Sequence, residues 1–300
     1  MKVAIVGLGL LGSSLAMALR GRGDYEIYGY ARRPAVVDWA LANQVADFAS
    51  TDPVAVIREA DLTVLALPIP QIIAFMRQHC NEFKPGGIVT DIGSIKGDIC
   101  RAALECFKGS GVCFVGSHPM AGTEKSGPMA AFKSLYDNAE VFVCPVDGLP
   151  SKNGAGCNAV DLVADFWRSI NTKVVKIEPG KHDKLVSHTS HLLHILAMSL
   201  TIAVLESGSN EENKLRLSGC ATGFKDTSRI ASSSPRMWRE IIEHNQAAVL
   251  SSLDDFERQF RQVRQLIEEK KFDEFEEMFA HGKELRDGWV EYKNNRNKLK

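Results

Sequence analysis

The sequence predicts an α/β domain with a doubly wound, mostly parallel sheet, followed by an all-helical domain. Short apolar runs alternate with amphipathic helical patterns over roughly the first 178 residues, which is the rhythm of βαβ units. After Pro179-Gly180 the strand-like runs disappear and long helical patterns follow. The chain of 300 residues also exceeds the size at which one hydrophobic core usually stops growing. We therefore expect domains over residues 1–178 and 179–300.

Each element of the first domain is predicted from the period of its apolar residues. The predicted strands are Val3–Val6, Glu26–Tyr30, Leu62–Leu67, Ile88–Ile92, Val112–Val115, Val141–Cys144 and Val174–Ile177. The predicted helices between them are Leu10–Arg20, Pro34–Asn43, Pro70–His79, Lys96–Phe107 and Asn158–Ile170.

In the second domain the helical patterns cover roughly His182–Leu205, Met237–Glu269 and Phe272–Arg296. From Leu250 to Ile267 apolar residues recur at steps of three and four, which is typical of a helix face that packs into a core. A domain built mainly from long helices has difficulty burying all its apolar faces alone. We therefore expect a homodimer through this domain.

Composition excludes several classes of protein. The formal charge of −1, from 36 Lys and Arg against 37 Asp and Glu, gives no field that would concentrate nucleic acid or an anionic membrane. The seven cysteines lack a CxxC pair, and a strand pattern begins directly at the N-terminus without a signal-peptide pattern. We expect a soluble, cytoplasmic protein with no nucleic-acid or membrane partner.

A glycine fingerprint follows the first predicted strand. In Gly7-Leu-Gly9-Leu-Leu-Gly12, Gly7 permits a tight turn, Gly9 lets a pyrophosphate approach, and Gly12 allows close helix packing. The helix that opens at Leu10 and Leu11 supplies amide donors and a positive dipole. This context predicts a bound nicotinamide or flavin dinucleotide, the alternative being a glycine-rich turn without a ligand.

The residues after the second strand favour NADP over NAD. An NAD site usually has an Asp or Glu about 20 residues beyond the fingerprint, but Tyr30-Ala31-Arg32-Arg33 occupies that place. Arg32 and Arg33 suit a 2′-phosphate, although either could simply be solvated. Ala31 and Pro68, which follow predicted strands, complete the expected cofactor contacts; NAD stays possible.

One histidine is the candidate acid or base. His118 lies in the segment Gly116–Gly127, at the end of the apolar strand Val112–Val115, where open α/β sheets present ligand-contacting groups. Ser94, at the end of another predicted strand, is expected either to cap the following helix or to orient the His118 imidazole.

The helical domain contributes further candidates. Its first helical pattern carries four histidines without the HExxH-like order of a zinc site, so we expect no metal: His182, His188, His191 and His194. Arg229 suits capture of a carboxylate, with Lys225 beside it; the alternative for Arg229 is an ion pair with Asp226. Trp238 is by default a core aromatic.

Taken together, these motifs resemble the prephenate and arogenate dehydrogenase family of tyrosine biosynthesis over nearly the whole chain. The motifs are GLGLLGSSLA, DIGSIKG, GSHPMAGTEKSG, SHLLH and GFKDTSRIASSSPRMW, in that order. The resemblance implies that His118 accepts the proton of the substrate's ring hydroxyl, with Ser94 holding the histidine or the hydroxyl, and that Arg229 binds a carboxylate. It also implies that His191, Thr123 and Trp238 line the substrate pocket, with Trp238 able to reach the pocket of the partner subunit.

The activity implied is oxidative decarboxylation of prephenate to 4-hydroxyphenylpyruvate, or of arogenate to tyrosine, with hydride transfer to NAD(P). A neutral His118 would make activity rise with pH through its pKa. The helical patterns run to the end of the chain, so we expect no appended mutase or regulatory domain. Two alternatives stay open: another NADP-dependent reductase of the β-hydroxyacid dehydrogenase or imine reductase type, whose Lys-x-x-Asn-Asn run is replaced here by Lys184-Leu-Val-Ser-His, and a non-catalytic dinucleotide sensor.

Overall fold

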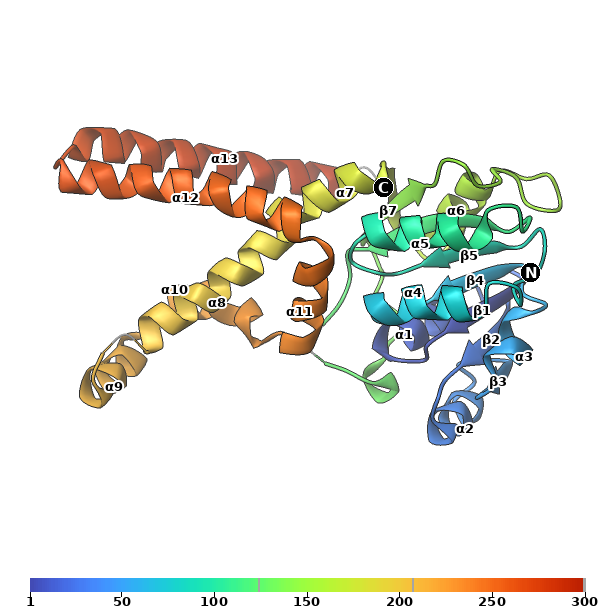
Figure 1. Cartoon of the computed structure of the whole chain (residues 1–300). Helices are drawn as coiled ribbons and strands as arrows, with labels where there is room; N and C mark the ends of the chain where they lie inside the picture. The colour runs from blue at the N-terminus through green and yellow to red at the C-terminus, as the bar shows by residue number, and fades with distance from the viewer. Residues whose placement is uncertain (124, 207, 299–300) are drawn as a thin grey trace. The chain divides into compact units, whose positions relative to one another are not determined.

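The structure is a computed structural model that describes residues 1–123, 125–206 and 208–298. Glu124 of the GSHPMAGTEKSG segment therefore lies outside the described residues. The chain divides into two compact units, residues 1–249 and the residues from 250 onward. The first unit holds a sheet with its helices and the helices α7 to α11, and the second holds most of α12 together with α13 (Figure 1).

The sheet has eight strands in the order β3-β2-β1-β4-β5-β6-β7-β8. All neighbouring strands pair in parallel except β6 and β7, which are antiparallel. The α/β class predicted from the sequence is thereby confirmed. The strands are β1 (Lys2–Val6), β2 (Glu26–Tyr30), β3 (Phe48–Ser50), β4 (Leu62–Leu65), β5 (Ile88–Asp91), β6 (Cys113–Pro119), β7 (Glu140–Pro145) and β8 (Lys173–Lys176).

Helices cover both faces of the sheet, because side chains alternate along each strand. In β1, Val3 and Ile5 pack with α1, α2 and α6, whereas Ala4 and Val6 pack with α3, α4 and α5. Figure 1 shows α4 and α5 side by side on one face. The helices are α1 (Leu10–Leu19), α2 (Pro34–Ala42), α3 (Pro53–Ile57), α4 (Ile69–Gln78), α5 (Gly97–Phe107) and α6 (Ala159–Arg168).

The predicted helical character of the rest of the chain is also confirmed. Three short helical turns are η1 (Pro128–Ala130), the π-helical η2 (Ser187–His191) and η3 (Arg229–Ser232). The α-helices are α7 (Pro179–Val186), α8 (Leu192–Leu205), α9 (Asn210–Gly219), α10 (Thr222–Ser228), α11 (Pro235–His244), α12 (Gln246–Glu268) and α13 (Phe272–Lys298).

The structure corrects four local expectations. The short β3 and α3 were not predicted, because three to five residues give too little periodicity to recognise. Strand β6 extends to Pro119, so His118 lies within the strand and pairs with Phe142 of β7. The segment that includes Lys225 is helical (α10), and the helix predicted over 237–269 is interrupted at Asn245.

One stretch among the described residues, Pro179–Leu205, has the length and the mean hydropathy, 1.4, of a membrane-spanning helix. Only 17% of its most apolar 18-residue segment is buried in the structure. Length and composition are weak evidence for a membrane span, because an apolar helix of a soluble protein meets the same criteria.

Candidate active site

The glycine loop after β1 has the geometry of a pyrophosphate cradle. Gly7 has φ +109°, and a Cβ there would lie 2.4 Å from the carbonyl oxygen of Ala66. A Cβ on Gly12 would lie 2.1 Å from the oxygen of Gly7, so α1 packs against the loop only with glycine. A Cβ on Gly9 would meet no atom within 4 Å, which leaves this part of the backbone open to a ligand.

The helix that follows this loop is ready to bind an anion. α1 begins at Leu10 and no side chain caps it, so the amides of its first turn, which includes Leu11, are available to an anion. The loop also stands at the point where strand order reverses, because β1 lies between β2 and β4. Open α/β sheets bind dinucleotides at this position, and these residues fit one.

The residues expected around the rest of the cofactor lie at the ends of β2 and β4. Ala31 is buried, while Arg32 and Arg33 are exposed and Arg33 precedes α2 as its N-cap. Neither arginine forms an ion pair with any described residue. Pro68 is exposed at the start of α4. Two exposed guanidiniums without an ion pair to a described residue therefore follow β2.

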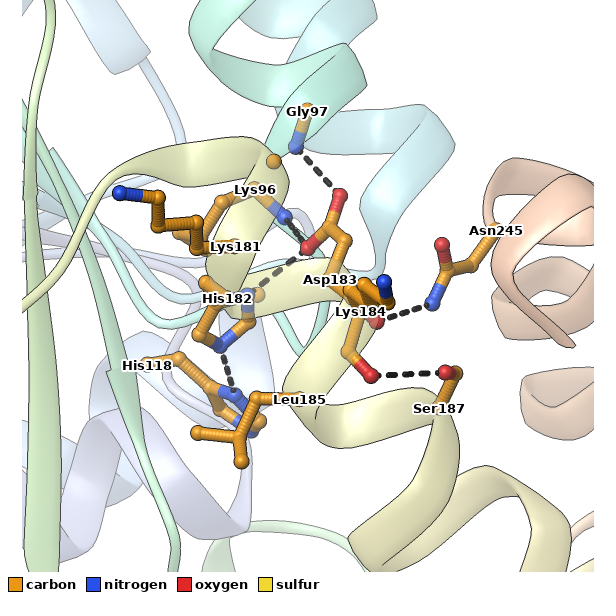
Figure 2. Close-up of polar contacts among 12 residues, drawn as sticks. Lys96, Gly97, His118, Lys181, His182, Asp183, Lys184, Leu185, Ser187 and Asn245 are labelled. Carbon is orange, nitrogen blue, oxygen red and sulfur yellow. Dashed lines mark hydrogen bonds and ion pairs between the residues drawn. The ribbon is translucent and has the colours of Figure 1, made fainter. Parts of the chain in front are cut away.

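His118 is 9% exposed and contacts a second histidine that the sequence analysis did not select. Its Nδ1 lies 2.9 Å from Nε2 of His182 in α7, and Nδ1 of His182 lies 2.7 Å from Oδ1 of Asp183. Asp183 in turn accepts hydrogen bonds from the backbone amides of Lys96 and Gly97, each at 2.7 Å. Figure 2 shows this series of contacts, which we call the histidine relay: His118, His182 and Asp183.

The environment of the relay favours a neutral His118. Burial, followed by the neighbouring His182, Lys96 and His191, holds the pKa of His118 well below its ordinary value. Burial also lowers the pKa of His182, although its hydrogen bond to Asp183 opposes the shift. Asp183 stays ionised: burial alone would raise its pKa, but the donors around it hold the pKa below its ordinary value. A neutral imidazole is a competent proton acceptor.

A fully buried ion pair supports this end of the sheet. The ammonium of Lys96 contacts the carboxylate of Asp91, and both side chains are shielded from solvent. Asp91 also accepts hydrogen bonds from the amides of Ser117 (3.1 Å) and Gly93 (2.8 Å). Gly116 leaves room for the lysine, because a Cβ there would lie 3.1 Å from Lys96 Cδ. The pair therefore ties β5 to β6 next to His118.

The expectation that Ser94 caps a helix is wrong. α5 begins at Gly97 with Lys96 as its N-cap, and Ser94 lies half-buried in the loop before it. Among the described residues no hydrogen bond joins Ser94 to His118, whose ring partner is His182. A role for Ser94 toward a bound substrate stays a prediction.

A second cluster surrounds Trp238, which is half-buried and packs against the core. Its ring stacks on His194 (centroids 3.9 Å apart) and meets His191 edge to face (5.7 Å). The side-chain amide of Asn245 donates to Nδ1 of His191 (3.2 Å) and to the carbonyl of Asp183 (3.0 Å). Burial lowers the pKa of His191 to about 4, so this ring is neutral at pH 7.

The remaining candidates lie on the surface. Arg229, at the start of η3, is exposed and forms no ion pair with Asp226 or any other described residue. Burial and the charge of Arg229 lower the pKa of His194, which places the guanidinium within electrostatic reach of the Trp238 cluster. Lys225 and Thr123 are exposed, and no contact joins either to His118. The structure thus brings His118, His191 and Trp238 into one region, with Arg229 at its edge.

Sequence motifs did not single out two members of the relay, His182 and Asp183. His182 was expected only as one of four helical histidines, and no role was predicted for Asp183. The available signal was the dipeptide His182-Asp183 directly after the last predicted strand, which puts an imidazole and a carboxylate at the edge of the sheet. Asn245 gave no signal, because an asparagine between two helices is usually a cap or a turn residue.

Comparison with known proteins identifies both parts of the chain. Residues 15–176 match the family model of the prephenate dehydrogenase nucleotide-binding domain, and residues 178–281 match that of the prephenate dehydrogenase dimerization domain. The prephenate dehydrogenase of Lactococcus lactis is 31% identical over 288 residues, which are 95% of this chain and 76% of that protein.

The chain is also similar to solved structures of prephenate and arogenate dehydrogenases. The crystal structure of A. aeolicus prephenate dehydrogenase in complex with hydroxyphenyl propionate and NAD+ has a TM-score of 0.85 and 29% identity, and covers 95% of this chain and 97% of that one. Synechocystis arogenate dehydrogenase has a TM-score of 0.83 and 28% identity, and covers 96% of this chain and 100% of that one. The chain therefore belongs to the prephenate dehydrogenase family of oxidoreductases.

Proposed function

We propose that this protein oxidatively decarboxylates prephenate or arogenate, forming 4-hydroxyphenylpyruvate or tyrosine, with NADP as its preferred hydride acceptor. The observation that carries the proposal is the buried, neutral His118 in β6, at the same sheet edge as the glycine loop. The match to both family models and the names of the relatives support the substrate class.

The chemistry needs one proton acceptor and one hydride acceptor. The bound dinucleotide supplies the hydride acceptor. His118 takes the proton of the ring hydroxyl while the C4 hydrogen leaves with its electron pair. The C1 carboxylate then leaves as carbon dioxide, and the electron pair of the broken carbon–carbon bond completes the aromatic ring. The substrate and the aromatic product differ by one hydride and one carbon dioxide, and no proton is lost overall. His118 therefore returns its proton to the phenolate oxygen.

Arg229 is proposed to bind a carboxylate of the substrate. Its guanidinium has no protein partner among the described residues and carries a fork of donors that matches a carboxylate. Lys225, His191, Thr123 and Trp238 complete the proposed substrate set. A relative of 29% identity was solved with hydroxyphenyl propionate, a phenol with a carboxylate, which is the chemistry this set would recognise.

The preference for NADP is proposed from Arg32 and Arg33. Both guanidiniums are exposed after β2, and no carboxylate follows that strand to hold a ribose hydroxyl and repel a phosphate. The dinucleotide in the A. aeolicus relative is NAD+, so NAD stays the alternative for this chain.

The protein is proposed to be a cytoplasmic homodimer, with the dinucleotide site in residues 1–178 and the subunit contact in residues 179–300. The match of residues 178–281 to a dimerization domain supports the contact. Large apolar side chains on α8 and α9 are exposed in the single chain and would be covered by a second copy: Leu193, Met198, Leu200, Ile202, Leu215 and Leu217.

Steady-state assays test the proposal. Purified protein is mixed with prephenate or arogenate and with NADP or NAD, and reduced nicotinamide is followed at 340 nm. We expect turnover with at least one pairing. His118→Asn should lower kcat by about 10²- to 10⁴-fold while dinucleotide affinity is retained. No turnover with any pairing, or full activity of His118→Asn, would refute the proposal. Binding of dinucleotide without any turnover would favour the sensor alternative.

A further inference from the structure

The hydrogen bonds behind His118 determine which of its ring nitrogens is free to take a proton. Asp183 accepts from two backbone amides and is ionised, so it acts only as an acceptor toward His182. Nδ1 of His182, 2.7 Å from Asp183 Oδ1, must therefore carry a proton and donate it.

The tautomer of His182 then sets that of His118. Burial keeps His182 neutral by lowering its pKa, so its single ring proton is on Nδ1 and its Nε2 presents a lone pair. Nδ1 of His118 lies 2.9 Å from that lone pair and must donate to it. A neutral imidazole has one ring proton, so Nε2 of His118 is the unprotonated atom.

We propose that His182 and Asp183 are positioning residues that hold His118 in its Nδ1–H tautomer, so that His118 Nε2 receives the hydroxyl proton of the substrate. The substrate in this proposal rests on the proposed function, whereas the tautomer does not. In the step, the substrate O–H bond breaks, an N–H bond forms at Nε2, and the Nδ1–H bond to His182 is kept. The proton later returns from Nε2 to the phenolate oxygen.

The relay keeps its hydrogen bond to Nδ1 of His118 when His118 takes the substrate proton. An imidazolium at a site only 9% exposed is costly unless an opposite charge is near. Asp91 is engaged by Lys96, whereas Asp183 contacts His182, the ring partner of His118. A buried carboxylate behind an imidazole is also the arrangement that holds the catalytic histidine of a Ser-His-Asp triad in one tautomer and orientation. The charged or titratable groups around His118 are Lys96, Asp91, His182, Asp183 and His191.

A spectroscopic experiment on the ligand-free wild-type protein tests the tautomer directly. Nitrogen-15 NMR of ring-labelled histidines, with His118→Asn used to identify the His118 signals, should show a protonated Nδ1 and an unprotonated Nε2 at pH 7. A protonated Nε2 in the free protein would overturn the proposal. Because no substrate is present, this result is independent of which substrate the enzyme uses.

Variants at His182 test the consequence for catalysis. His182→Leu removes the acceptor, and we expect kcat to fall about 10²- to 10³-fold with dinucleotide affinity retained. His182→Gln places an amide oxygen near the position of Nε2 and should restore a large part of kcat and the Nδ1–H tautomer. The matched control is His79→Asn, a histidine 4.0 Å from Glu82 and outside the relay, which should leave kcat unchanged.

Three outcomes separate the proposals. Unchanged kcat in His182→Leu, or equal losses in His182→Leu and His182→Gln, would overturn the positioning role. If neither prephenate nor arogenate is turned over but the tautomer is as expected, the proposed function fails and the tautomer assignment stands. If turnover occurs with His118 protonated on Nε2, the positioning role fails and the proposed function stands.

Discussion

Lys96 and Asp91 form an ion pair in which neither side chain has any solvent exposure. Burial raises the pKa of Asp91, although Lys96 and the two amides that donate to it oppose this shift. Removing one partner of such a pair leaves an uncompensated buried charge, whereas a surface pair contributes little. The pair lies beside His118, so its loss affects the stability of the sheet edge that carries this histidine.

We therefore expect Lys96→Met to lower the free energy of unfolding by about 3–5 kcal/mol, measured by urea denaturation. The matched control is Lys84→Met, which breaks a half-exposed pair with Asp61 and should cost at most about 1 kcal/mol. Combining Lys96→Met with Asp91→Asn should recover part of the loss. A double variant less stable than Lys96→Met would contradict this account.

The pH dependence of kcat/KM should report the burial of His118. Protonated His118 has no lone pair for the substrate hydroxyl, so activity is lost as pH falls through its pKa. Since burial holds that pKa well below the usual value of about 6.5, the rising limb should lie in the acid range and the profile should be level from pH 7 to 8. A limb centred above pH 6.5 would show that the titrating group is not this buried imidazole.

Arg32 should control the choice of dinucleotide. Arg32→Ala removes a charge-assisted hydrogen bond to a 2′-phosphate, so kcat/KM with NADP should fall about 10- to 100-fold while kcat/KM with NAD changes little. The control is Arg20→Ala, whose guanidinium pairs with Asp47 on the same domain. The expected observable is the ratio of the two kcat/KM values. An unchanged ratio in Arg32→Ala combined with Arg33→Ala would remove the basis for an NADP preference.

Arg229 should act mainly on substrate binding. Arg229→Ala is expected to lower kcat/KM for the substrate about 10²-fold. Arg229→Lys keeps the charge but loses the fork of donors, so its kcat/KM should lie between those of the wild-type protein and Arg229→Ala. Arg236→Ala, which breaks an exposed pair with Glu240, serves as the control. Dinucleotide KM should not change in either variant. A loss of the same size with Arg236→Ala would mean that the effect is not specific to Arg229.

The exposed apolar surface of α8 should hold two subunits together. Ile202 on this surface is half-exposed in the single chain. A charged side chain at this position would be buried unfavourably in a subunit contact, so Ile202→Glu should shift the mass measured by light scattering from dimer toward monomer. Glu59→Lys, on the surface of the sheet domain, should leave the mass at that of a dimer. A monomeric wild-type protein, or a fully dimeric Ile202→Glu variant, would contradict a contact through α8.

Much of the chain could be predicted because its signals are local. β2 was predicted over Glu26–Tyr30, as observed, and α1 was predicted to within one residue, since the period of apolar side chains depends only on neighbouring positions. The glycine fingerprint is equally local: a Cβ on Gly12 would collide with the backbone of Gly7, five residues before it. The family resemblance and the choice of His118 rest on the same kind of short motif.

The partners of those residues could not be read from the linear order. His182 and Asp183 meet β6 and the start of α5 across 64 and 87 positions, and Asn245 reaches Asp183 across 62. Such contacts depend on how helices dock on the sheet, and no short pattern records them. Residue types and their periods thus specified the elements, the dinucleotide loop and the choice of His118 as a candidate. Only the tertiary structure decided that His118 is buried against His182 and that its pKa is lowered, because burial and charge proximity exist only once the chain is folded.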